Sequence, residues 1–121
     1  MTAPIRVTGP LLDILELFLH AWQDQRDLHG WQIMREARLT GPTVFRVLDQ
    51  LEDRGWIIGS WDQQGARQGQ PRVRLYRLSP TGTVAAREVI AEQSMMAQKR
   101  TRWRVRPGFA QRVRLGPARV G

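Results

Sequence analysis

Apolar residues in the first half of the chain recur with a helical period. The run PLLDILELFLHAW, which starts at Pro10, places most of its apolar residues on one helical face, and Leu12 and Leu19 widen that face. A shorter helix is expected in WQIMREARL, and a third between Thr40 and Arg54. In the third segment, apolar side chains recur at i, i+3, i+4 and i+7, namely Val44, Val47, Leu48 and Leu51. The pattern predicts three consecutive helices.

Two runs with the composition of β-strands follow the third helix. They are WIIGSWD and RVRLYRL, separated by QQGARQGQP, a loop rich in Gly, Gln and Arg. Ser79 as N-cap and Pro80 at the first helical position then begin a last helix, which must end before Pro107. The order predicts an α+β, mostly α fold: a winged helix-turn-helix domain at 10–78, a C-terminal dimerisation helix at 79–104 and a basic tail at 105–121.

The positive charge of the chain is concentrated at its C-terminal end. The formal net charge is +8. Residues 1–97 contain equal numbers of arginines and acidic residues, whereas residues 98–121 contain one lysine, seven arginines and no acid. A basic block of this kind is typical of an arm that binds polyanions such as nucleic acid, and the alternative is a solvated, disordered end.

The composition argues against several classes of function. The chain has no cysteine, two histidines and one tyrosine, and it contains neither a metal-ligand cluster nor a phosphate-binding glycine loop. We therefore expect no enzyme activity, no cofactor and no metal site. No apolar run approaches the roughly 20 residues of a membrane span, and the first ten residues do not have the pattern of a signal peptide. A cytoplasmic protein without membrane contact is expected.

Residues of about 10–95 resemble the PadR-like family of bacterial transcriptional regulators. LHGWQI matches the LHGYEI-like start of that family's second helix, and TGPTVFRVLDQLEDRGWI is similar to its recognition helix, SPGTLYxALxRLExxGLI. GQPRVRLYRLSPTG is similar to the family's GRPxxYYxLTxxG. Phe45 stands where the family usually has a tyrosine, and therefore lacks the phenolic hydroxyl. The resemblance implies a dimeric, repressor-like protein whose first and last helices form the dimer interface.

The polar side of the third helix carries candidate base-reading side chains. Thr43, Arg46 and Gln50 lie about one turn apart, opposite the apolar face. Arginine pairs bidentately with guanine and glutamine with adenine, and Thr40 with the free amides of the first turn suits a phosphate. Further DNA-binding candidates are Arg35 on the second helix and the wing residues Arg67, Arg72 and Arg74. The alternative is that these are ordinary solvated surface residues.

A homodimer bound to double-stranded DNA is the expected assembly, and packing within a monomer is the alternative. The interface candidates lie on the first and last helices and are Leu11, Leu15, Phe18, Val89, Ile90, Met96 and Trp103. Two-fold symmetry predicts a pseudo-palindromic site with half-sites about 10 bp apart. A small-molecule effector at the dimer interface is a further hypothesis, against ordinary core packing, for Trp22, Met34, Met95, Met96 and Trp103.

Together these features favour a sequence-specific DNA-binding transcriptional regulator of repressor type, bound as a homodimer to a pseudo-palindromic operator. Two alternatives stay open. A winged-helix module that docks a protein or RNA would show an exposed apolar patch on the third helix or wing. A nonspecific DNA-binding protein would depend on its basic tail instead.

Overall fold

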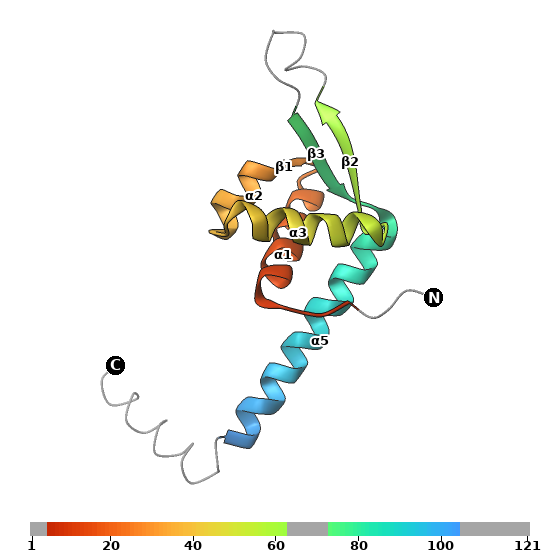
Figure 1. Cartoon of the computed structure of the whole chain (residues 1–121). Coiled ribbons are helices and arrows are strands. Elements are labelled where there is room, and N and C mark those ends of the chain that lie inside the picture. Colours follow the sequence, from red (N-terminus) through yellow and green to blue (C-terminus); the bar gives the residue numbers. More distant parts are fainter. Residues whose placement is uncertain (1–4, 63–72, 105–121) are drawn as a thin grey trace, which may run out of the picture. The chain divides into compact units, whose positions relative to one another are not determined.

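The computed structural model describes residues 5–62 and 73–104, apart from the side chains of 102–104 (Figure 1). The elements follow the expected order, and they confirm a winged helix-turn-helix fold. They are α1 (Gly9–Gln23), β1 (Leu28–His29), α2 (Gly30–Ala37), α3 (Gly41–Asp53), β2 (Ile57–Asp62), β3 (Val73–Leu78) and α5 (Pro80–Arg104). The chain forms two compact units, Met1–Ile90 and Ala91–Gly121, and α5 begins in the first and continues in the second. The expected domain boundaries stay a prediction.

The sheet of the first unit has three antiparallel strands in the order β1-β3-β2. β2 and β3 form the expected hairpin, with register running from Ile57 opposite Leu78 to Asp62 opposite Val73. β1 is a two-residue strand that pairs Leu28 with Tyr76. The sequence does not predict this strand, because two residues are too few to show an alternating pattern. Because α2 follows β1 directly, β1 places α2 beside the wing, which is the hairpin of β2 and β3.

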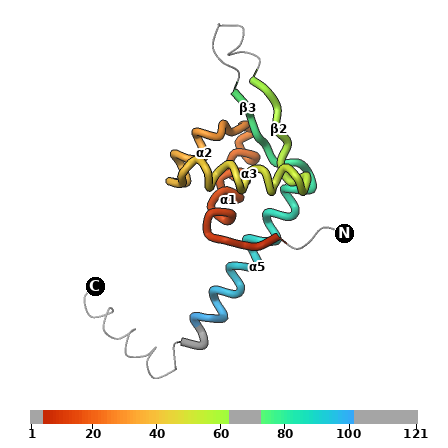
Figure 2. Tube along the Cα trace, in the orientation of Figure 1, coloured from red at the N-terminus to blue at the C-terminus, as the bar shows by residue number. Residues whose placement is uncertain are grey.

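Helix α1 is the central helix of the first unit, and it packs against α2, α3 and β3 (Figure 2). This packing explains why the helix is apolar on more than one side. Leu11, Leu15 and Phe18, which were expected at a dimer interface, are at most 1% exposed within a single chain. Their assignment to that interface is corrected here, because these side chains fill the core of one protomer and present no surface to a second copy. The expected apolar face of α3 is buried against the same core.

Ser79 joins the beginning of α5 to the turn between α3 and β2. Its hydroxyl donates to the carbonyl oxygen of Gly55 at 2.5 Å, with that of Trp56 at 3.2 Å as a second acceptor. The same oxygen accepts from the amide of Gly82 at 2.9 Å, as expected of an N-cap. Gly55 adopts φ +73°, the left-handed conformation expected just after a helix end. The end of α3, the start of β2 and the start of α5 therefore meet at one place (Figure 1).

Gly82 allows the backbone of α5 to lie directly against that turn. A Cβ atom on residue 82 would overlap the backbone carbonyl of Trp56. We expect Gly82→Ala to lower the free energy of unfolding by about 2 kcal/mol or more, because the backbone must shift to relieve this overlap. Urea denaturation followed by circular dichroism measures the change.

The matched control is Gly9→Ala, because a Cβ on Gly9 meets nothing within 4 Å. That variant should stay within about 0.5 kcal/mol of the unaltered chain. Equal stability of the two variants would show that the close approach of α5 does not contribute to folding.

Candidate nucleic-acid interface

The outer face of α3 presents polar side chains where the sequence analysis expected them. Arg46 and Gln50 are exposed, and Thr43 is half-buried at the edge of the same face. Thr40 is the N-cap residue, but its hydroxyl donates to the Thr43 hydroxyl at 3.1 Å and does not cap the helix amides. The backbone amides of the first turn of α3 therefore have no side-chain cap, and the hydroxyls of Thr40 and Thr43 lie at the same end of the helix.

A cleft of about 490 Å³ runs between α3 and the segment before α1. Its lining brings together Thr43, Arg46 and Gln50, and it adds a second arginine, Arg6, that the sequence analysis missed. The remaining lining residues are Thr8, Pro10 and Val47. None of these seven residues is acidic and two are arginines, so the lining carries a positive formal charge. The missed signal was local: Ile5, Arg6, Val7 and Thr8 alternate between apolar and polar residues.

Arg74 is engaged within the fold, whereas the sequence analysis expected it to contact DNA from the wing. Its Nη2 atom donates to Oε2 of Glu52 at 2.7 Å, which connects β3 to α3. The guanidinium lies 5.3 Å from the ring centre of Trp61 and 5.8 Å from that of Tyr76. A Cβ on Gly59 would lie only 2.6 Å from Nη2, so the glycine makes room for this group. Arg74 thus attaches the wing to α3, and its expected contact with DNA stays a prediction.

The Arg74 anchor also affects the electrostatics of its neighbours. The hydrogen bond to Glu52 raises the pKa of the Arg74 guanidinium. Burial raises the pKa of the Tyr76 phenol, and the positive charge of Arg74 opposes this shift. Glu52 is one of the acids near the C-terminal end of α3, and its ion pair offsets negative charge beside the candidate interface.

The other DNA-binding candidates lie apart from this cleft or outside the described residues. Arg35 on α2 is exposed, with its guanidinium 5.6 Å from the ring centre of Trp31. It borders a smaller cleft shared with Trp31, Gln32 and Glu36. Arg67 and Arg72 lie outside the described residues. The structure thus groups three of the expected residues with Arg6, and places Arg35 elsewhere.

The remaining interface candidates lie in both units. Val89 and Ile90 are half-buried and pack against the core of the first unit. Met96, in the second unit, is 48% exposed. The side chain of Trp103 lies outside the described part of the chain. Val89, Ile90, Met96 and Trp103 stay predicted interface residues.

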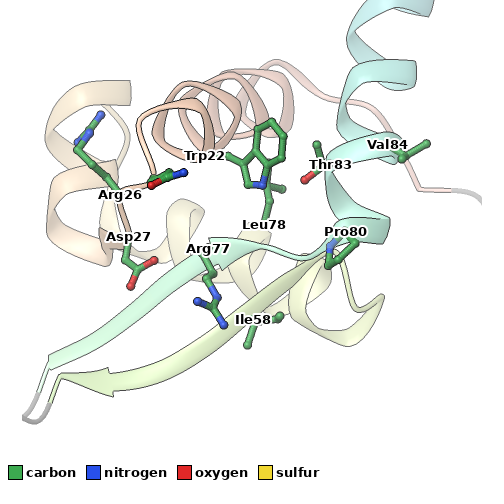
Figure 3. A pocket seen from close by; sticks show the side chains of 10 residues that line it. Trp22, Arg26, Asp27, Ile58, Arg77, Leu78, Pro80, Thr83 and Val84 are labelled. Carbon is green, nitrogen blue, oxygen red and sulfur yellow. The ribbon is translucent and has the colours of Figure 1, made fainter.

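A second groove, of about 550 Å³, lies between the end of α1, the sheet and the beginning of α5 (Figure 3). Trp22, Ile58 and Val84 supply exposed apolar surface on its lining. The guanidinium of Arg87 lies 5.2 Å from the ring centre of Trp22. Met34, expected beside Trp22 at an effector site, packs against the core instead and does not line this groove.

Comparison with known proteins places the fold among winged helix-turn-helix structures. No model of a known protein family matches the sequence, and no curated protein matches it. Staphylococcus aureus MepR, a transcription regulator of the multidrug efflux pump MepA, is similar with a TM-score of 0.65 and 19% identity, over 94% of this chain and 77% of MepR. Lactococcus lactis ZitR gives a TM-score of 0.59 and 14% identity, over 96% and 74% of the two chains.

AF1382 from Archaeoglobus fulgidus is also similar, with a TM-score of 0.60 and 14% identity over 74% of this chain and 90% of that one. Likenesses at such identities establish the winged helix-turn-helix fold. The PadR-like resemblance stays a sequence-level expectation. Within the described residues, no helix combines the length and hydropathy that a membrane span requires.

Tyr76 offers a direct test of the anchored wing, because it is the only tyrosine of the chain. Its raised pKa means that the folded protein holds the phenol proton more tightly than the unfolded chain does. Below about pH 10 the phenol is protonated in both states, and the free energy of unfolding should not depend on it. As the pH rises from there through the pKa of Tyr76 in the folded protein, the free energy of unfolding should fall. Phenolate absorbance near 295 nm should give a midpoint above about 10 in the native protein.

The same titration in urea is the control, and its midpoint should return to about 10. A native midpoint at or below the urea value would contradict the burial of the Tyr76 phenol in the folded protein.

Proposed function

We propose that the protein is a sequence-specific regulator of transcription that binds double-stranded DNA through α3. The observation that carries the proposal is the cleft on the flank of α3, whose lining carries a positive formal charge. It combines Arg46 and Gln50, two side chains suited to reading base edges, with a second arginine and no acid in its lining. The likeness to MepR, a transcription regulator of the same fold, supports it.

In this proposal the face of α3 that carries Thr43, Arg46 and Gln50 enters the major groove. Arg46 forms a bidentate pair with guanine, Gln50 pairs with adenine, and Thr43 contacts a thymine methyl group or a phosphate. The uncapped amides at the start of the helix attract a phosphate. Asp53 is exposed at the C-terminal end of α3 and disfavours phosphate there, so the start of the helix lies closer to the DNA backbone.

We further propose that two copies bind one operator. Several apolar side chains of α5 are exposed and would gain from burial, among them Val84, Met95 and Met96. Because Leu11, Leu15 and Phe18 fill the core, the interface is assigned to the surface of α5. A two-fold dimer reads a pseudo-palindrome with half-sites about 10 bp apart. A repressor role follows the PadR-like resemblance.

A second candidate function has one observation in its favour. Phe45 on α3 and Trp61 on β2 are 46% and 49% exposed, and exposed aromatic residues on the third helix or the wing are what a protein-docking module would present. In that case Phe45→Ala and Trp61→Ala would abolish binding of a partner protein, while substitution of Arg46 would have little effect.

The proposal is tested by selecting bound duplexes from genomic fragments at about 150 mM salt, a concentration at which nonspecific binding is weakened. The whole chain should enrich one pseudo-palindrome. Arg46→Ala should weaken binding to the selected duplex by about tenfold, because a lost bidentate pair costs about 1–3 kcal/mol of discrimination. It should leave binding to unrelated duplexes much less affected.

Arg26→Ala is the matched control, because Arg26 is also exposed and pairs with Asp24, away from α3. It should bind the selected duplex as the unaltered chain does. Binding without any preferred sequence, or equal affinity of the Arg46→Ala variant and the unaltered chain, would contradict base reading by α3.

A further inference from the structure

The segment before α1 is held in place against the core of the first unit. Ile5 and Val7 are half-buried and pack on the core. The residues that alternate with them, Arg6 and Thr8, are exposed. The Thr8 hydroxyl accepts from the amide of Leu11 at 3.3 Å, which attaches the segment to the first turn of α1. This alternation fixes the outward direction of Arg6.

Arg6 and Arg46 line one cleft although they come from different elements. Thr8, Thr43 and Gln50 add hydroxyl and amide groups to the same lining. Neither arginine forms a salt bridge with a described residue, whereas Arg74 pairs with Glu52 and Arg26 with Asp24. Two positive groups beside one cleft, with donors around them and no acid in the lining, favour an anion in that place.

We propose that Arg6 binds a phosphate of the DNA backbone at the edge of the groove that α3 enters. This inference rests on the proposed function. A helix in the major groove has phosphates along both of its flanks, and the cleft lies on the flank formed by Thr43, Arg46 and Gln50. The planar guanidinium matches phosphate bidentately. Arg6 therefore sets the register of α3 on the duplex, and Arg46 reads bases.

The two roles predict different responses to salt and sequence. Arg6→Ala should lower affinity about tenfold on both the selected duplex and a scrambled duplex of equal length, as expected for one charge-assisted contact. The slope of log K against log salt concentration should become shallower by about 0.9, the effect of one phosphate contact. Arg6→Lys should keep the slope and lose part of the affinity, because it keeps the charge but not the planar fork.

Arg26→Ala is again the matched control, and it should change neither the affinity nor the slope. Urea denaturation should show Arg6→Ala as stable as the unaltered chain, since the side chain is exposed. Unchanged affinity and slope in Arg6→Ala would overturn the inference. A loss confined to the selected duplex would also overturn it, because that pattern belongs to a base contact.

The two proposals fail in distinguishable ways. If the unaltered chain prefers its selected duplex and Arg46→Ala removes the preference, the proposed function stands whatever Arg6→Ala does. If the unaltered chain binds both duplexes equally, sequence reading by α3 is wrong, and a changed salt slope in Arg6→Ala would still identify a phosphate contact. Absence of any DNA binding overturns both proposals.

Discussion

The Ser79 hydroxyl connects the two backbone segments on which the rest of the first unit depends. It donates a hydrogen bond to the carbonyl oxygen of Gly55, in the turn between α3 and β2. It accepts a hydrogen bond from the amide of Gly82 in the first turn of α5. Gly82 lacks a Cβ and so permits this contact. Because one residue fixes the end of α3, the start of β2 and the start of α5, the direction of the helix and that of the wing are set together.

A second constraint decides which charges are available at the surface of α3. Arg74 lies over Gly59 and pairs with Glu52, so the wing is attached to the helix by an arginine that the sequence alone suggested for DNA. That pair neutralises an acid beside the candidate interface. Arg46 and Arg6 form no salt bridge with a described residue and lie at one cleft. The fold thus engages one arginine in an internal ion pair and leaves two at the lining of one cleft.

Local signals predicted most of the fold, and long-range contacts account for what they missed. The period of Val44 and Leu51 predicted the buried face of α3, and cap chemistry predicted the role of Ser79, since each depends on neighbours a few residues away. Strand β1, the partner of Arg74 and the place of Arg6 beside Arg46 depend on residues distant in the chain. The apolar pattern of α1 does not show that Leu11, Leu15 and Phe18 face the core of one protomer, because a helical pattern cannot tell an internal partner from a second copy.

The central claim is that the outer face of α3 contacts DNA bases, and amide chemical shifts measure it most directly. Titrating the isotopically labelled whole chain with its selected duplex should produce the largest shift changes between Thr43 and Gln50, with a second, smaller group around Arg6. A scrambled duplex should shift the residues around Arg6 more than those of α3. Largest changes at Trp31 and Trp61, with α3 unaffected by the selected duplex, would contradict the claim.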